Sequence, residues 1–219
     1  MKWQSKCSLF FILILLSFSN QIFAHATVID IEKMSNSQTL FLYLQLGFEH
    51  IIPLGLDHIV FIIALFIINP QIKPILVQAT AFTIAHTITL GLSMFQIIKA
   101  PTQIVEVIIA ISILYVTVEN IFFDSVKPSR VAVVFLFGLI HGLGFAAVLS
   151  EIGLPQNKFI PSLLMFNIGV ELGQIAVIAA VYFILIKWVK DKLFYRKKIV
   201  IPISILISVV AISWIIERI

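Results

Sequence analysis

Six long apolar segments, separated by short polar connections, constrain this chain more than any other feature of its sequence. They lie at about 39–69, 74–97, 101–123, 130–150, 159–187 and 199–216. A membrane-spanning α-helix needs about 20 apolar residues in a row. Only helices and closed barrels cross a bilayer, because every backbone polar group must be paired within the protein. The segments therefore predict an all-α membrane helix bundle of about six transmembrane helices, with neighbouring helices antiparallel.

The composition agrees with a membrane protein. The 219 residues are 60% hydrophobic and 12% charged, with a mean hydropathy of +1.10, which excludes an ordinary soluble domain. The net charge of +4 is compatible with nucleic-acid binding, but the basic residues gather at the ends of the apolar segments. We therefore expect a lipid bilayer as the partner, and no nucleic acid.

The N-terminus has the pattern of a secretory signal peptide over residues 1–24. Lys2 and Lys6 precede a short apolar core, and small residues follow at the exit, with cleavage after Ala24 or Ala26. An uncleaved helix is the alternative. We expect a short periplasmic segment at 25–38 and a transmembrane domain at 39–219. The only cysteine, Cys7, lies in the leader, so any bound metal would have nitrogen and oxygen ligands.

The charges of the connections predict the orientation in the membrane. If the signal peptide is cleaved, the mature N-terminus is periplasmic and the connections alternate from there. Nine basic residues then lie inside and four outside, which satisfies the positive-inside rule for a bacterial inner membrane. The nine are Lys73, Lys127, Arg130, Lys187, Lys190, Lys192, Arg196, Lys197 and Lys198, and the four are Lys33, Lys99, Lys158 and Arg218.

The stretch at residues 47–58 sets ionisable side chains inside the first apolar segment. Glu49, His50, Asp57 and His58 lie here, and a charged group at bilayer depth costs at least ~2.5–3.5 kcal/mol, so such residues are candidates for function. Pro53 removes an amide and clashes with the carbonyl of Glu49. We expect a broken helix that faces a polar cavity and contributes to a metal-ion site.

Two further histidines strengthen the prediction of a metal site. His86 and His141 fall near the middle of their segments, so three segments offer imidazole or carboxylate at similar depth. These groups are the usual ligands of divalent nickel, cobalt, zinc or iron when sulfur is absent. Taken singly, each histidine could be a hydrogen-bonded structural residue. Thr83 and Thr87 flank His86, and their hydroxyls could orient its ring or bond back to their own helix.

Polar residues in the third and fifth segments could line an ion path. The third contains Glu106, Ser112, Glu119 and Asn120, and the fifth contains Asn167, Glu171 and Gln174. Hydrogen bonds between helices are the alternative for the amides, whereas an acid in lipid must be paired or neutralised. Glycine pairs four residues apart occur at Gly138 and Gly142 and at Gly169 and Gly173, a spacing that lets helix backbones approach closely.

Together these residues form ordered motifs that resemble the HupE/UreJ membrane protein family over about residues 40–190. The motifs are Gly47-Phe48-x-His50-Ile51-x-Pro53-x-Gly55-x-Asp57-His58, Phe82-Thr83-x-Ala85-His86-Thr87-x-Thr89-Leu90, Val105-Glu106-x-x-Ile109-Ala110-x-Ser112-Ile113, Val118-Glu119-Asn120, Phe137-Gly138-Leu139-x-His141-Gly142-Leu143-Gly144-Phe145-Ala146 and Phe166-Asn167-x-Gly169-Val170-Glu171-Leu172-Gly173-Gln174.

The resemblance implies a nickel or cobalt permease with a cleaved signal peptide and six spans. Members of the family are associated with hydrogenase and urease accessory genes. Their nickel-associated motif, a histidine followed after five residues by Asp-His, carries over onto His50, Asp57 and His58. This chain has six intervening residues, which would rotate His50 by about a third of a turn in a regular helix.

The leading hypothesis is a permease for a divalent transition-metal ion, with nickel first and cobalt or zinc as alternatives. The ion would enter past Glu49 and His50, bind among the Asp57 carboxylate and the three other intramembrane histidines, and leave toward Glu119, while Glu171 would tune the charge. Homo-oligomers or metalloenzyme maturation proteins are candidate partners.

Two other functions stay open. An intramembrane metal-dependent hydrolase could use the same cluster, although the His-Glu-x-x-His and Gly-x-Ser-x-Gly signatures are missing. A non-transporting accessory protein is the third.

Overall fold

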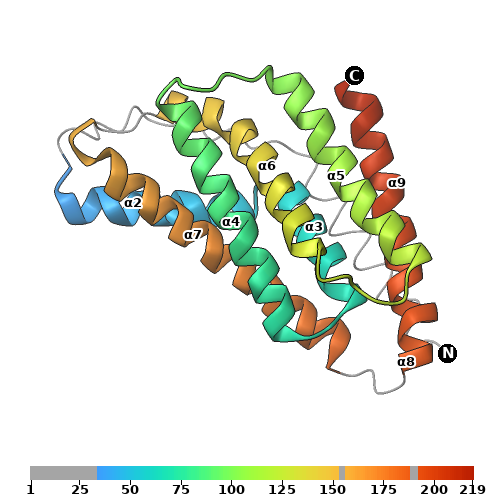
Figure 1. Ribbon diagram of the computed structural model, residues 1–219. Coiled ribbons are helices and arrows are strands. Elements are labelled where there is room, and N and C mark those ends of the chain that lie inside the picture. The colour runs from blue at the N-terminus through green and yellow to red at the C-terminus, as the bar shows by residue number, and fades with distance from the viewer. Residues whose placement is uncertain (1–33, 153–155, 188–191) are drawn as a thin grey trace. The chain divides into compact units, whose positions relative to one another are not determined.

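The computed structural model describes residues 34–152, 156–187 and 192–219, which are all-helical (Figure 1). The predicted signal peptide, the start of the segment at 25–38, Lys33 and Lys190 lie outside these ranges. The elements are α2 (Asn36–Ile51), α3 (Leu56–Ile68), α4 (Ile72–Met94), α5 (Thr102–Phe122), α6 (Arg130–Ile152), the 3₁₀ turn η2 (Gln156–Lys158), α7 (Phe159–Val181), the π-helical turn η3 (Tyr182–Ile186), α8 (Lys192–Tyr195), the π-helical turn η4 (Arg196–Val200) and α9 (Ile201–Arg218).

The helices confirm the predicted class of membrane protein. Four of them are long and apolar enough to cross a membrane, namely Ile72–Met94, Thr102–Phe122, Phe159–Ile186 and Arg196–Arg218. The pair α2 and α3 makes a fifth if it counts as one span bent by 66°. The apolar stretch Arg130–Ala146 of α6 is shorter than the others. Four to five spans are thus supported in the described ranges, and the number six stays a prediction.

The predicted break in the first span is confirmed at Pro53. Helix α2 ends at Ile51, and the carbonyl of Glu49 accepts from the amide of Leu54 at 3.2 Å because proline has no amide to offer. Gly55 closes the turn against the carbonyl of His50, where a Cβ would overlap that oxygen. The break therefore turns the chain so that α3 starts beside the end of α2.

The glycine pairs allow two close helix crossings, as their spacing predicts. Where α2 crosses α7, a Cβ on Gly169 would meet the backbone of Gly47 and its neighbours. Where α4 crosses α6, a Cβ on Gly142 would overlap the carbonyl of His86, and one on Gly138 that of Phe82. Close backbone contact of this kind drives helix association in lipid. The second crossing also brings the histidine of α4 next to α6.

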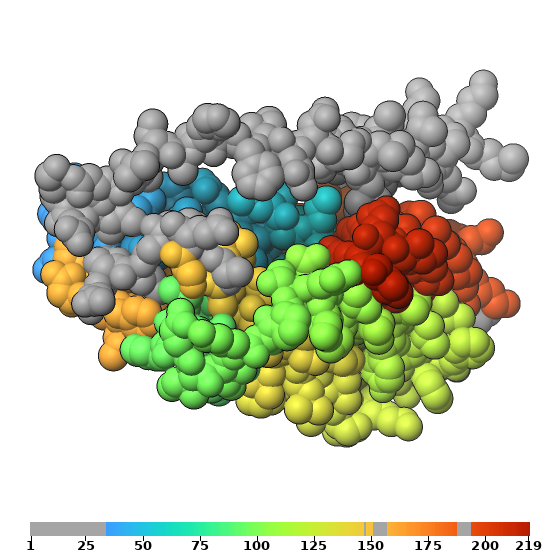
Figure 2. Space-filling view, turned by 90° about the horizontal axis from the view of Figure 1, so that it is seen from above, coloured from blue at the N-terminus to red at the C-terminus, as the bar shows by residue number. Residues whose placement is uncertain are grey.

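The C-terminal helix α9 packs against α5. Helix α9 lies along α5, as Figures 1 and 2 show from two directions. Within this contact the hydroxyl of Ser208 donates to that of Thr117 at 2.8 Å. Helix α5 in turn contacts α3 and α6. Of the elements that carry the histidines, α2, α3 and α4 contact α7, whereas α3 and α6 contact α5.

Candidate functional site

Four buried histidines from four different elements meet in the bundle. His50 comes from the last turn of α2, His58 from the first turn of α3, His86 from α4 and His141 from α6. The ring centroid of His58 lies 4.7 Å from that of His50, 6.1 Å from that of His86 and 5.2 Å from that of His141. The structure therefore brings together the four histidines that the sequence places inside apolar segments.

Two of these rings have their tautomer fixed by a neighbour. The Nδ1 of His141 lies 2.8 Å from the carbonyl oxygen of Phe137, which can only accept, so this nitrogen carries the proton. The Nδ1 of His58 lies 2.9 Å from Oδ1 of Asp57, and a carboxylate likewise accepts. In both rings Nε2 is then the nitrogen with a free lone pair. Metal-binding histidines typically donate their other ring N–H to a carboxylate or carbonyl in this way.

Five of the six remaining ring nitrogens are buried without hydrogen-bond partners in the part of the chain that the structure describes. They are Nε2 of His50, His58 and His141 and both nitrogens of His86. Burying a polar atom unpaired costs about 1–3 kcal/mol, and the large majority of buried side-chain polar atoms in proteins have a partner. Several orphaned nitrogens in one place therefore indicate a site built to meet a ligand.

The spacing of the rings suits a shared cation, although the rings do not yet form a coordination sphere. Imidazoles that bind one tetrahedral ion at roughly 2.0–2.1 Å have ring centroids roughly 5 Å apart, and the observed separations range from 4.7 to 6.1 Å. No group of three or more His, Cys, Asp or Glu side chains in the described ranges is placed to hold a metal ion as it stands. Rotation of the rings about their side-chain bonds would be needed.

A pair of phenylalanines covers one side of the histidines. The rings of Phe145 in α6 and Phe166 in α7 stack at 5.2 Å with an interplanar angle of 14°. Phe145 lies 3.9 Å from the ring of His50, and Phe166 lies 5.7 Å from it. This pair, which we call the Phe145 lid, shields His50.

A second pair of phenylalanines lies next to His141, another histidine that contacts His58. The rings of Phe61 in α3 and Phe82 in α4 are 5.5 Å apart, and they lie 5.6 and 4.8 Å from the ring of His141. These phenylalanines are site residues that the sequence did not predict. The available signal is the spacing of four residues from Phe82 to His86, which puts both on one helix face. Apolar rings on both sides keep the dielectric low and strengthen any electrostatic interaction within.

Glu171 does not reach the histidines through a described contact; it is bound to α4. The hydroxyl of Thr80 donates to Oε1 of Glu171 at 2.7 Å, and that of Thr83 donates to Oε1 of Gln174 at 3.1 Å. The two threonines are three residues apart on α4, as Glu171 and Gln174 are on α7. Two side-chain hydrogen bonds therefore connect these helices. The hydrogen bond of Gln174 is of the interhelical kind that the sequence offered as an alternative role for the amides. The sequence did not predict Thr80 as the partner of Glu171.

Several of the other polar residues bond back to their own helix. Thr87 donates to the carbonyl of Thr83 at 2.7 Å, and Thr83 donates to that of Ala79 at 3.2 Å. Neither hydroxyl holds the ring of His86, both of whose nitrogens are unpaired in the described ranges. Asn167 and Ser112 likewise donate to carbonyls within their own helices, those of Leu163 and Ile109, each at 2.7 Å.

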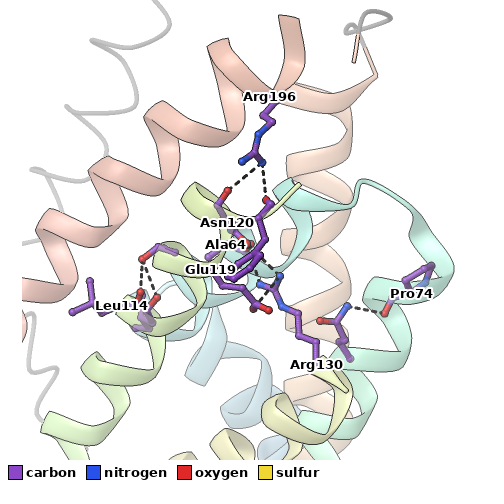
Figure 3. Close-up of polar contacts among 11 residues, drawn as sticks. Ala64, Pro74, Leu114, Glu119, Asn120, Arg130 and Arg196 are labelled. Carbon is purple, nitrogen blue, oxygen red and sulfur yellow. Dashed lines mark hydrogen bonds and ion pairs between the residues drawn. The ribbon is translucent and has the colours of Figure 1, made fainter. Parts of the chain in front are cut away.

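Glu119 and Asn120 belong to a separate polar cluster around Arg130 (Figure 3). The guanidinium of Arg130 donates through both terminal nitrogens to Oδ1 of Asn120 at 3.2 Å and lies 3.5 Å from a carboxylate oxygen of Glu119. Asn120 donates to the carbonyl of Ala64 in α3 at 2.7 Å. Arg130 precedes His141 by 11 residues on α6, about 16 Å along the axis. The structure therefore does not bring Glu119 to the histidines.

The last two acids are engaged near helix ends. Glu106 lies 3.9 Å from Nε of Arg218, and its backbone carbonyl accepts from the same guanidinium at 3.0 Å. Glu49 accepts a hydrogen bond from Gln45 at 2.8 Å within α2. Of the acidic residues that the sequence singled out, only Asp57 touches the histidine cluster.

Apolar helices of spanning length around a buried group of imidazoles define a polytopic helical membrane protein with a polar site in its interior. Within this class the chain belongs to a particular family. It matches the family model described as HupE / UreJ protein over residues 9–218, nearly its whole length. No curated protein and no solved structure matches it.

Proposed function

We propose that this member of the HupE/UreJ family is a permease for a divalent transition-metal ion in the bacterial inner membrane. Nickel is the first candidate, and cobalt and zinc are alternatives because imidazole suits all three. One observation carries the proposal: buried imidazoles from three other elements surround His58, and five ring nitrogens of the four histidines are buried without hydrogen-bond partners in the described ranges.

The chemistry of the cluster fits cargo that must be released. Imidazole binds a metal in its neutral form, and the Asp57 carboxylate beside His58 would contribute one negative charge toward the two charges of the cation. Conduction requires a site that binds well enough to admit the ion but weakly enough to let it leave. Mixed nitrogen and oxygen ligands drawn from α2, α3, α4 and α6 meet that need, because a small displacement of one helix changes the ligand set.

The proposed path crosses the two phenylalanine pairs. With the predicted orientation, α6 runs from the inner to the outer side, so Phe145 lies one turn beyond His141 on the outer side. An ion that enters past Glu49 must displace the Phe145 lid to reach His50. Exit toward the inner side passes Phe61, and Glu119 takes part only if its ion pair with Arg130 opens.

The proposal is tested by accumulation of radioactive nickel and cobalt in cells that express the wild type, His58→Ala or Gln78→Leu at matched membrane levels. Gln78 is a buried polar residue eight positions before His86 on α4, so its replacement controls for loss of any buried polar group. We expect uptake above the empty vector for the wild type and Gln78→Leu, and uptake at the empty-vector level for His58→Ala. Equal accumulation in all cells would refute the permease for these ions.

Titration of the purified protein with Co²⁺, followed by visible absorption, separates passage from chemistry. Binding by the wild type that is lost in His58→Ala assigns the cluster as the metal site. Binding without accumulation in cells would argue against transport and favour the hydrolase alternative.

A further inference from the structure

A second polar site lies away from the histidines, where α5 ends and α6 begins. It is an open cavity of about 290 Å³. Its polar lining includes Tyr115, Glu119, Lys127, Ser129 and Arg130. Arg130 sits at the first position of α6, and Figure 3 shows its guanidinium directed to Asn120 and Glu119. The metal proposal involves this cavity only through Glu119, and only if its ion pair with Arg130 opens.

The cavity is rich in hydrogen-bond donors that are not used elsewhere. Arg130 is only 2% exposed, and its Nε is buried without a hydrogen-bond partner in the part of the chain that the structure describes. The ammonium of Lys127 makes no ion pair there and lies 5.5 Å from the centroid of the Phe123 ring. The hydroxyl of Ser129 adds a third donor at the start of the helix. Lys127 and Ser129 are exposed, so water satisfies them until an anion enters the cavity and replaces it.

The charge of the cavity selects an anion. The carboxylate of Glu119 is matched by Arg130 at 3.5 Å, so the positive charge of Lys127 remains in excess. A divalent cation would be repelled, which disfavours this cavity as its exit vestibule. The start of α6 adds the positive end of a helix dipole, which favours phosphate groups.

The walls and position of the cavity favour an amphiphile over a free ion. Val118, Phe123 and Val133 line it with apolar surface beside the donors. It sits at the connection between two apolar helices, where headgroups meet water, and this connection is predicted to be on the inner side. Basic pockets between helices on that side are typical binding sites for anionic lipid headgroups.

We propose that the cavity binds the phosphate group of an anionic phospholipid through Lys127 and Ser129, next to the buried Arg130, with an acyl chain along the apolar wall. The proposal is independent of metal transport.

The test uses the purified full chain in detergent, titrated with phosphatidylglycerol or phosphatidylcholine and followed by native mass spectrometry. The variants are Lys127→Gln and, as the matched control, Lys73→Gln, an exposed lysine in the first turn of α4 that does not line the cavity. We expect the wild type to prefer phosphatidylglycerol. Lys127→Gln should weaken that binding roughly fivefold, the effect of one basic residue near an anionic surface, and Lys73→Gln should leave it unchanged.

Competition with inorganic phosphate tests whether the cavity recognises phosphate alone or the whole lipid headgroup. Displacement of phosphatidylglycerol that depends on Lys127 supports recognition of phosphate itself, and no displacement together with a Lys127-dependent lipid preference supports the whole headgroup. Equal affinity for the two lipids, or equal losses in Lys127→Gln and Lys73→Gln, would overturn the proposal. Because both lysines are exposed, neither variant should unfold the protein, and a thermal unfolding curve checks this.

Discussion

The carboxylate of Asp57 holds the ring of its neighbour His58, with 2.9 Å between Oδ1 and Nδ1. The same oxygen accepts from the backbone amide of His58 at 2.8 Å, so it also pairs one of the amides in the first turn of α3. One side chain thereby orients the ring, fixes its tautomer and places a negative charge beside the cluster. His58 is the histidine that contacts the other three, so Asp57 acts on the centre of the site.

Asp57→Asn should weaken metal binding while the fold is kept. The amide preserves shape but removes the charge and no longer dictates which nitrogen of His58 is protonated. Loss of such a partner typically costs roughly 10–100-fold in metal affinity. Calorimetric titration of the purified protein with Ni²⁺ measures the change. Asp124→Asn is the control. Asp124 is an exposed acid that forms an ion pair with Arg196 and has no contact with the histidines among the described interactions. Equal affinities in both variants would contradict the role of Asp57.

Gly142→Ala should destabilise the protein more than Gly144→Ala. A Cβ on Gly142 would overlap the backbone carbonyl of His86, which cannot move without shifting α4, whereas a Cβ on Gly144 would meet only the side-chain ends of Ile109 and Val105 at 3.2 and 3.3 Å. Overpacking a tight contact typically costs about 1–3 kcal/mol. Thermal unfolding in detergent compares the two variants. A lower midpoint for Gly144→Ala would show that the α4–α6 crossing is not the tighter contact.

Arg130→Gln should strongly lower stability, and adding Glu119→Gln should recover part of the loss. Removing one member of a buried ion pair leaves the other charge uncompensated, at about 3–5 kcal/mol, while removing both leaves no buried charge. Arg130 is almost fully buried, and its side chain also holds Asn120. The unfolding free energies of both single variants and the double variant complete a double-mutant cycle. Strict additivity would mean that the two charges do not interact.

Phe145→Ala should expose His50 to water-soluble reagents. The phenylalanine ring covers that imidazole at 3.9 Å, and its removal opens one side of the cluster. We expect His50 to be modified faster by diethyl pyrocarbonate, as measured by peptide mass spectrometry. The control is Phe41→Ala, since Phe41 is 66% exposed on α2. Unchanged modification of His50 in Phe145→Ala would rule out the Phe145 lid as its cover.

The sequence predicts those parts of the structure that depend on local stereochemistry. Pro53 breaks its helix because it lacks an amide, and the effect needs no knowledge of the fold. The glycine pairs mark close crossings because a missing Cβ has the same consequence in any bundle. The convergence of His50, His58 and His141 follows from similar depth in a small bundle, which hydropathy alone indicates.

The partners of the acids could not be predicted because they are set by packing between distant segments. Glu119 meets Arg130 only because α5 and α6 lie side by side after their connection. Glu171 is bound by Thr80, 91 residues away, and Glu106 by Arg218, 112 residues away. An acid on an apolar helix indicates that a partner exists, but its identity depends on how the helices rotate against one another.

The turn at Pro53 and Gly55 has a mechanical consequence. Two residues eight positions apart would be about 12 Å apart along a continuous helix, yet the rings of His50 and His58 lie 4.7 Å apart because the chain is broken and bent by 66° between them. Each of the two half-helices therefore carries one imidazole next to the break. A change in the angle between α2 and α3 would alter the distance between the two imidazoles. The affinity of the site for a cation would therefore depend on that angle, and not only on the strength of each ligand.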